Sequence, residues 1–326
     1  MVALAVPKLE STSYLNSISQ FDHPLQILEL LGKREPVFMA LNKILTEKPQ
    51  LDLFNSEKLE DVLREIEGLV VRDRPIYKRW KQKDAKGKER DLAVPKEPLK
   101  KFFQFYLKPF LLEIPNHPCS HGGEIISKRA AGFSPHTSLR FHVPIGSVLS
   151  FDLSSAYKAV TIEDVFDLYN NNLEDKVNDP NLRTNVGGLL AALSTVFYPD
   201  TNTRALPQGS PISSLLFNRA LYSLDEQLSN YSKEHGLTFT RWIDDFTLSS
   251  RDSNLSAEIF YTVLGIVSKN YPLAEHKVYL QRKPPYFLLG HKIRGSGIAK
   301  VEYADDYKIG EPVKKELYQE FLSLNQ

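Results

Sequence analysis

The sequence predicts an α+β fold, in which a helical N-terminal part precedes a region of helices alternating with short strands. Apolar residues at helical spacing after Asn55-Ser56 predict a helix over residues 59–70. The apolar run Val148–Leu153 is typical of a buried strand, and aromatic and β-branched residues on both sides of Asp244-Asp245 predict two strands around a tight turn. Such a succession is typical of a sheet covered by helices.

The composition is that of an ordinary globular protein. The 326 residues are 42% hydrophobic and 25% charged, which is enough for two or three subdomains around substantial cores. No apolar run reaches the roughly 18 residues of a membrane-spanning helix, and the first residues lack the basic region of a signal peptide. The single cysteine, Cys119, allows no internal disulfide and is expected to be a buried small hydrophobe. We therefore expect a cytoplasmic protein with no membrane partner.

Charge is distributed unevenly over the first hundred residues. Residues 1–70 carry 7 Lys/Arg and 11 Asp/Glu, whereas residues 72–101 carry 12 Lys/Arg and 5 Asp/Glu. The basic segment contains two predicted strands around a Lys-Gly turn, over residues 77–96, and an amphipathic helix follows over 99–110. A basic stripe fits phosphate binding, and it is equally consistent with a solvated charged face.

The same patterns predict the remaining elements. Helical spacing and capping residues predict helices at 22–31, 36–48, 181–197, 212–231, 255–270 and 312–324, and strand composition predicts strands at 277–282 and 286–293.

Three acids occupy positions where a metal site could form. Asp152 ends a predicted strand, and Asp244-Asp245 lie at the predicted turn 92 residues later. An α+β sheet could bring these strands together, and the carboxylates would then repel one another unless cations neutralise them. Mg²⁺ prefers such oxygen ligands, and two ions roughly 4 Å apart support phosphoryl transfer. Taken alone, an Asp-Asp turn is more commonly a solvated one.

Five motifs over residues 75–295 resemble those of the prokaryotic reverse transcriptases found in retrons, group II introns and antiphage defence systems. Each motif alone is weakly specific, but five of them in the same order and spacing are a specific signal. In chain order they are Asp152 with Tyr157, Pro207-Gln208-Gly209, Trp242-Ile243-Asp244-Asp245, Lys277, and Phe287-Leu288-Leu289-Gly290-His291.

The resemblance implies a right-hand polymerase with a ferredoxin-like palm, fingers, a helical N-terminal extension and a short thumb. It implies that residues 1–71 form the extension, 72–147 the fingers with the basic hairpin, 148–285 the palm with part of the fingers, and 286–326 the primer grip and a minimal thumb. Only about 35 residues follow the primer grip, so we expect either that the thumb is minimal or that a partner protein or an RNA supplies the missing grip.

The resemblance also implies an RNA-directed DNA polymerase that uses two Mg²⁺ ions, with Mn²⁺ as an alternative. Asp152 and Asp244 would hold the ions, Asp245 would support them, and Leu153 would lend a backbone carbonyl. Lys277 would donate a proton to pyrophosphate, although a surface lysine is an equally good reading of that residue.

The remaining motif residues would bind the nucleotide and the primer. Tyr157 would exclude a 2′-hydroxyl, and Gln208 and Gly209 would contact the incoming nucleotide. Lys88 and Arg90 would clamp the triphosphate, with the choice among Lys86, Lys88 and Arg90 left open. The predicted primer contacts are Trp242, which replaces the family's usual tyrosine, and Leu289, Gly290 and His291.

The implied partners are an RNA template, a DNA or RNA primer, dNTPs and, by analogy with retron and defence enzymes, a companion non-coding RNA. Tyr303-Ala304-Asp305-Asp306 spells the family's catalytic motif but follows the primer grip, so we expect a surface turn there. Two other functions stay open: a template-independent or protein-primed DNA polymerase, and a non-catalytic nucleic-acid-binding subunit. Three metal-ready carboxylates argue against the non-catalytic one.

Overall fold

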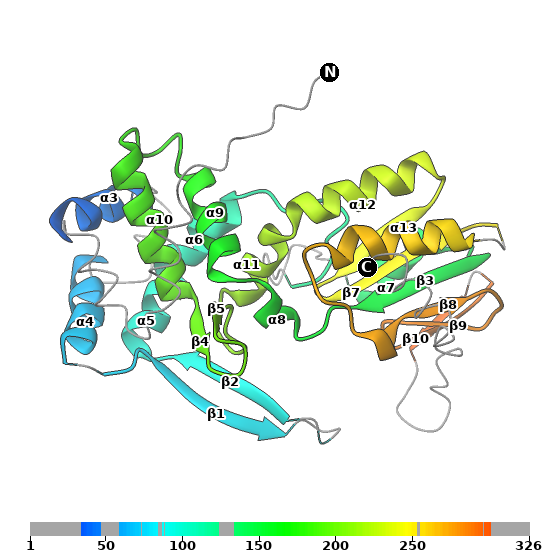
Figure 1. Ribbon diagram of the computed structural model, residues 1–326, viewed down its shortest axis with the longest axis horizontal. Helices are drawn as coiled ribbons and strands as arrows, with labels where there is room; N and C mark the ends of the chain where they lie inside the picture. The colour runs from blue at the N-terminus through cyan, green and yellow to red at the C-terminus, as the bar shows by residue number, and fades with distance from the viewer. Residues whose placement is uncertain are drawn as a thin grey trace. The chain divides into compact units, whose positions relative to one another are not determined.

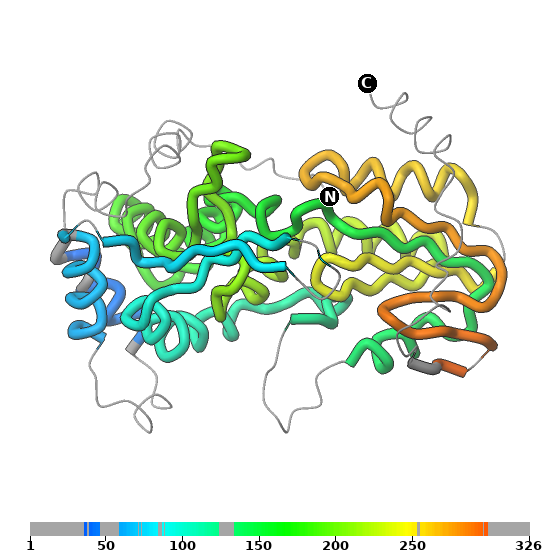
Figure 2. The backbone as a smooth tube through the Cα atoms, turned by 90° about the horizontal axis from the view of Figure 1, so that it is seen from below, coloured from blue at the N-terminus to red at the C-terminus, as the bar shows by residue number. Residues whose placement is uncertain are grey.

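The structure is a computed structural model, shown in Figures 1 and 2. It describes residues 34–46, 59–72, 74–83, 87, 89–123, 134–252, 255–295 and 297–300. The predicted helices at 22–31 and 312–324, residues Lys86 and Lys88, and the segment Tyr303–Asp306 lie outside the described residues. The chain folds into two compact units. The first contains residues up to Ile114 together with Val160–Leu216, and the second contains Pro115–Ala159 and the residues from Phe217 onward.

The first unit is mainly helical. Its core helices are α3 (Arg34–Thr46), α4 (Leu59–Val71), α9 (Ile162–Asn172) and α10 (Pro180–Ser194). Leu59, Val62, Leu63 and Ile66 are buried, so the apolar stripe of the sequence is the packed face of α4. The predicted helix over 99–110 is present as three consecutive pieces: α5 (Glu97–Lys101), a π-helical segment (Phe102–Leu107) and α6 (Lys108–Glu113).

Two hairpins complete the first unit. The predicted basic hairpin is confirmed as β1 (Tyr77–Lys83) and β2 (Glu89–Pro95), the long cyan pair in Figure 2. The second hairpin, β4 (Val196–Tyr198) with β5 (Thr203–Ala205), lies partly inside the helix predicted over 181–197 and corrects that prediction. Arg204 is buried and donates to the carbonyls of Ala192 and Thr195. That contact ties β5 to the end of α10.

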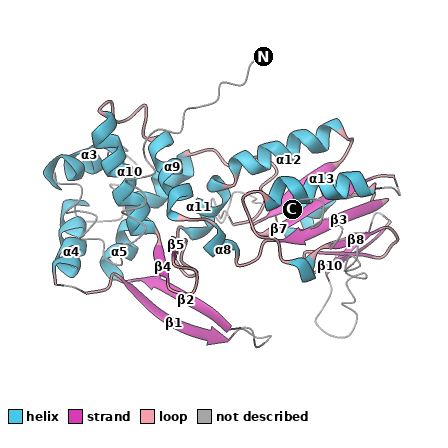
Figure 3. Cartoon of the chain, in the orientation of Figure 1, coloured by secondary structure: helices cyan, strands magenta, loops and turns pink. Residues whose placement is uncertain are grey.

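The second unit is built on a four-stranded antiparallel sheet with the order β6-β7-β3-β8. Its strands are β3 (Ser147–Asp152), β6 (Thr238–Trp242), β7 (Asp245–Ser250) and β8 (Tyr279–Gln281). This order is the ferredoxin-like, split βαβ arrangement. In Figures 1 and 3, α12 (Tyr222–Glu234) and α13 (Ala257–Ser268) cover one face of the sheet. The sheet predicted from the strand composition around Asp152 and Asp244-Asp245 is therefore confirmed.

Several predicted boundaries in this region are wrong. The helix predicted over 212–231 is divided at Leu221 into α11 (Ser213–Ala220) and α12. The strand predicted over 286–293 is a hairpin of β9 (Tyr286–Leu288) and β10 (His291–Arg294), and β11 (Gly297–Lys300) pairs beside it. Short helices α7 (Pro135–Leu139), α8 (Ala156–Ala159) and two 3-10 turns, Arg140–His142 and Glu275–Lys277, connect these strands.

Two composition-based expectations are also addressed by the structure. Cys119 is buried, as expected for a small hydrophobe. Within the described part of the chain, no helix combines the length and the apolar character that crossing a membrane requires.

Candidate active site

Strand register brings two of the predicted catalytic residues, Asp152 and Asp245, together on one face of the sheet with Trp242. Asp152 on β3 lies directly opposite Asp245 on β7, and Asp245 lies directly opposite Trp242 on β6. Directly opposed residues of antiparallel strands share a face, so Trp242, Asp245 and Asp152 form a row across three strands. The row unites residues that are 90 positions or more apart in sequence, as Trp242 and Asp152 are.

On the opposite face of the sheet, the residues next to the two aspartates are aromatic and closely packed. Phe151 and Phe246, the next residues along β3 and β7, are also directly opposed, and their ring centroids are 4.9 Å apart in a stacked arrangement. Both are fully buried. Because neighbouring side chains on a strand point to opposite faces, this stack is the support that holds the two aspartates at fixed positions.

Asp244 lies in the two-residue loop between β6 and β7, here called the acid turn (Ile243 and Asp244). The Leu153 amide donates to the Asp244 carbonyl at 3.3 Å. The backbone following Asp152 is thus hydrogen-bonded to the acid turn itself. The Asp152 carbonyl accepts from the Ala274 amide at 2.9 Å, which ties the same point to the loop before Lys277.

Burial and a nearby positive charge determine the electrostatics of the carboxylates at this site. Burial raises the pKa of Asp245 to about 6. The Lys277 ammonium donates to Oδ2 of Asp152, so a positive charge lies directly on one of the predicted metal ligands. Carboxylate and backbone carbonyl oxygens are hard ligands that suit Mg²⁺, and the donor set therefore fits a divalent ion.

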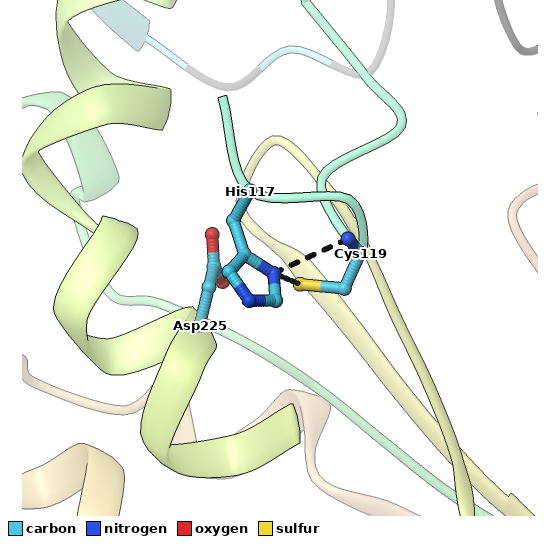
Figure 4. A group of neighbouring side chains, drawn as sticks. All are labelled: His117, Cys119 and Asp225. Atoms are coloured by element: carbon cyan, nitrogen blue, oxygen red, sulfur yellow. Dashed lines mark hydrogen bonds between the residues drawn. The ribbon is translucent and has the colours of Figure 1, made fainter. Parts of the chain in front are cut away.

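The three aspartates do not form a closed ligand shell. Among the described residues, one group of three His, Cys, Asp or Glu side chains has its potential ligand atoms within 4.8 Å of one another. That group is His117, Cys119 and Asp225 (Figure 4), and the three aspartates are not such a group. Asp152 lies directly opposite Asp245, and Asp244 precedes Asp245 in the acid turn. An open arrangement is expected where substrate phosphates complete the coordination of Mg²⁺.

Tyr157, the predicted sugar contact, lies on α8 shortly after Asp152. It is half-buried, and its ring centroid is 5.6 Å from that of Phe217 in the second unit. The ring is therefore braced by an apolar neighbour while keeping an exposed part.

The predicted nucleotide-binding residues of the first unit are joined through β2. The Gln208 carbonyl accepts from the Ala93 amide at 2.8 Å, and Arg90 lies three residues before Ala93 on the same strand. Gly209 has φ +116°, and a Cβ there would lie 3.0 Å from a methyl group of Val94. Only glycine fits this approach without strain, which explains its place in the loop.

The predicted primer-contacting residues Leu289, Gly290 and His291 lie at the tip of the β9–β10 hairpin. Leu289 and Gly290 both have positive φ, +47° and +73°, as a tight two-residue hairpin turn of type I′ requires. His291 is buried, and its Nδ1 lies 2.8 Å from the Leu289 carbonyl. Leu289 and Gly290 thus form the turn, and His291 is the first residue of β10, in a separate three-stranded sheet.

Two buried polar side chains around the β6–β7 hairpin were not predicted. Arg241 is fully buried, and His142 bridges β6 and β7 through Thr240 and Ser249. A sequence signal existed for Arg241: with a period of two, it shares the face of Phe239 rather than that of Trp242. No comparable pattern marked His142.

A family model described as reverse transcriptase (RNA-dependent DNA polymerase) matches residues 83–293. The retron Mx162 reverse transcriptase of Myxococcus xanthus is 29% identical over 185 residues, covering 53% of this chain and 35% of that protein. The retron Ec86 reverse transcriptase of Escherichia coli is 26% identical over 171 residues, covering 52% of this chain and 47% of that protein. The matches span less than half of the length of these curated relatives.

Among solved structures, the chain is similar to the apo telomerase of Candida tropicalis truncated from its C-terminal domain. The TM-score is 0.47 at 12% identity, over 69% of this chain and 55% of that chain. Because the family model covers well over half of the sequence and spans all five motifs, the chain belongs to the reverse transcriptase (RNA-dependent DNA polymerase) family.

Proposed function

We propose that this chain is an RNA-directed DNA polymerase that extends a primer with dNTPs. The observation that carries the proposal is the row formed by Asp152 and Asp245 in register on neighbouring strands, with Asp244 on the adjoining turn. Two-metal phosphoryl transfer needs hard anionic ligands on rigid elements, and this arrangement supports it. The family membership supports the same chemistry.

In this proposal Asp152 and Asp244 hold two Mg²⁺ ions, Asp245 supports them and the Leu153 carbonyl completes one site. Bound divalent ions would activate the primer hydroxyl and stabilise the leaving pyrophosphate. Lys277 already donates to Asp152, and we propose that its ammonium protonates the departing pyrophosphate. Mn²⁺ has the same preference for oxygen ligands and is the alternative ion.

We assign the other predicted contacts to substrate binding. Arg90 and Lys88 bind the triphosphate, Gln208 and Gly209 the nucleotide, and Tyr157 the sugar. Trp242 lies opposite Asp245, which supports its assignment to the primer end, and we assign Leu289, Gly290 and His291 to the primer as well. Catalysis would then consist mainly of positioning and electrostatic stabilisation.

We also propose the subdomain roles that these assignments require. Residues 72–147 act as fingers, 148–285 as the palm with part of the fingers, and 286–326 as primer grip and minimal thumb, after an extension at 1–71. The named relatives are retron enzymes, which supports a companion RNA as template or primer and a role in antiphage defence.

Primer extension tests the proposal directly. The assay uses an RNA template with an annealed DNA primer, Mg²⁺ and dNTPs, and compares the wild type with Asp152→Asn and Asp244→Asn. Losing several kcal/mol of transition-state stabilisation corresponds to a decrease of roughly 10³-fold in rate. Asp252→Asn is the matched control, since Asp252 is an exposed aspartate just beyond the other end of β7.

Each outcome decides between the proposals. Extension that is lost in the two variants and kept in Asp252→Asn supports templated synthesis with these ligands. Products formed without a template support the template-independent or protein-primed polymerase instead. Tight RNA binding without synthesis, for any template or primer, would show a non-catalytic nucleic-acid-binding subunit.

A further inference from the structure

Arg241 immediately precedes the Trp242–Asp245 motif and is fully buried. It is the largest of the fully buried side chains among the described residues. It lies on β6 directly opposite Phe246, on the face of the sheet that points away from Asp245 and Trp242. Its guanidinium lies 5.7 Å from the ring centroid of Phe217 and 5.9 Å from that of Phe246. A charged side chain in such a place needs partners for every donor.

All five N–H groups of the Arg241 guanidinium have an acceptor. Nε and Nη2 donate to the two carboxylate oxygens of Asp225, at 2.7 and 2.5 Å. Nη2 also donates to Oγ of Ser120 at 3.1 Å, and Nη1 donates to Oδ1 of Asn218 at 3.0 Å. The remaining Nη1 bond, at 2.7 Å, goes to the backbone carbonyl of Ile243 in the acid turn. The planar fork of arginine matches this set, and lysine could not reproduce it.

The acid turn needs such support because its backbone is strained. Ile243 has φ +57°, in the left-handed region, and it is the first residue of a two-residue hairpin loop. Hairpin turns with positive φ at that position normally have glycine there. A β-branched residue in this region is a genuine outlier, and such strain persists only where the surroundings hold it.

Asn218 links the Arg241 network to the loop of Gly122, which also contacts the acid turn. Asn218, held by Arg241, donates through Nδ2 to the Gly122 carbonyl at 2.7 Å. A Cβ on Gly122 would lie 2.9 Å from the Ile243 nitrogen and 3.0 Å from the Trp242 ring. The loop that contains Gly122 therefore lies in close contact with both residues that precede Asp244.

We propose that Arg241 is a positioning residue: by holding the Ile243 carbonyl, it keeps Asp244 and Asp245 in the orientation that binds divalent metal. This inference rests on the proposed function. Asp225 neutralises Arg241 and fixes the plane of its guanidinium, while Asn218 extends its hold to the Gly122 loop. Arg241 touches neither substrate nor metal and acts through the backbone of the turn.

The nearby group of His117, Cys119 and Asp225 in Figure 4 belongs to this network rather than to a metal centre. Both oxygens of Asp225 accept bonds from Arg241, and the His117 Nδ1 lies 3.0 Å from the Cys119 sulfur, within hydrogen-bond reach. Burial raises the pKa of the Cys119 thiol, whereas a metal ligand must be a thiolate. Asp225 therefore functions as the counter-ion of Arg241.

The test measures Mn²⁺ binding by electron paramagnetic resonance in the absence of nucleotide, beside the Mg²⁺ dependence of primer extension. Arg241→Lys keeps the charge and loses the fork, so its Mn²⁺ dissociation constant is expected to rise about tenfold or more, as for other supports of metal ligands. Ser120→Ala removes one Arg241 contact that does not touch the turn, and it is expected to bind Mn²⁺ like the wild type. Wild-type affinity in Arg241→Lys would overturn the proposal.

A rescue experiment separates turn positioning from a general loss of packing. Adding Ile243→Gly to Arg241→Lys relieves the left-handed strain, so a large part of the lost Mn²⁺ affinity should return. No recovery would mean that Arg241 serves only the fold. If Arg241→Lys does not fold, the double variant Arg241→Met/Asp225→Leu decides, because it leaves no unpaired buried charge and still lacks the bond to Ile243.

Different outcomes contradict the proposed function and the positioning role of Arg241. Wild-type protein that does not bind Mn²⁺, or binds it equally well after Asp152→Asn, contradicts the metal site of the proposed function. Wild-type binding that depends on Asp152 but is unchanged in both Arg241 variants contradicts the positioning role alone.

Discussion

The β1–β2 and β6–β7 hairpins are both antiparallel pairs of strands, and they use charge in opposite ways. In β1 all residues after Tyr77 are exposed, whereas the inner residues of β6 and β7 are buried. The ion pairs follow the same division. Arg79–Asp91 is about a third exposed and Lys81–Glu89 more than half, while Arg241–Asp225 is completely buried.

This difference in the burial of charge fits different roles for the two hairpins. On the exposed β1–β2 hairpin, here called the outer hairpin, Arg79 and Lys81 are paired with acids across the strands. Arg90 lies on the other face of that hairpin, opposite Gln82. Charge there is exposed or partly exposed to solvent. On the buried β6–β7 hairpin, here called the inner hairpin, the charge of Arg241 is fully hydrogen-bonded. It holds the Ile243 backbone next to Asp244 and Asp245. Substrate binding needs the first kind of charge and catalytic geometry the second.

The largest expected effect is on the buried pair. Asp225→Ala leaves the Arg241 guanidinium buried without its counter-ion, which should lower the free energy of unfolding by about 3–5 kcal/mol. Urea denaturation followed by circular dichroism measures the change. A loss below about 1 kcal/mol would mean that the inner pair is no more important to stability than a surface one.

The second expected effect is a pH dependence of the free energy of unfolding, which arises at the β6–β7 hairpin. His142 holds β6 and β7 together through Thr240 and Ser249, and burial, aided by the nearby His121, lowers the pKa of His142 to about 3. The unfolded chain takes up this proton near pH 6.5, so the stability from neutral His142 is complete above that pH and is lost as the pH falls toward 3. Between pH 7.5 and 5 the loss is about 2 kcal/mol.

Urea denaturation at several pH values checks this against His142→Gln, whose amide can hydrogen-bond in place of Nε2 and does not titrate. The variant should lose less stability on acidification than the wild type does. Parallel profiles for the two proteins would show that His142 does not titrate as the burial requires.

On the outer hairpin, binding rather than stability should change. Arg90→Ala removes the charge-assisted contact that we propose with the triphosphate, so the KM for dNTPs should rise roughly tenfold with little change in Tm. Lys81→Ala is the matched control, because Lys81 points to the opposite face and pairs with Glu89. Steady-state primer extension measures both, and equal effects of the two variants would contradict the assignment of Arg90.

The smallest expected effect is that of Asp91→Ala, which breaks the partly exposed pair with Arg79. Solvent screening limits its contribution to at most about 1 kcal/mol of unfolding free energy. Urea denaturation in parallel with Asp225→Ala gives the contrast directly. A loss as large as that of the buried pair would remove the distinction between the two hairpins.

Local patterns in the sequence predicted the elements that have strong periodicity or turn signals. The basic hairpin and the apolar stripe of α4 are at the predicted places, because strand alternation and helical spacing are local properties. The three-residue strands β4 and β5 were missed, since a run so short carries no period of its own. The break at Leu221 was missed because helical spacing continues on both sides of it.

The sequence by itself determined the family and the candidate ligands, because five motifs in a fixed order are local and specific. Only the tertiary structure decided that Asp245 lies directly opposite Asp152, since register between strands 92 residues apart depends on long-range pairing. It also decided that Arg241 is a buried anchor rather than a surface charge. Asp225, Asn218 and Ser120 come from separate segments, and only folding brings their acceptors to one guanidinium.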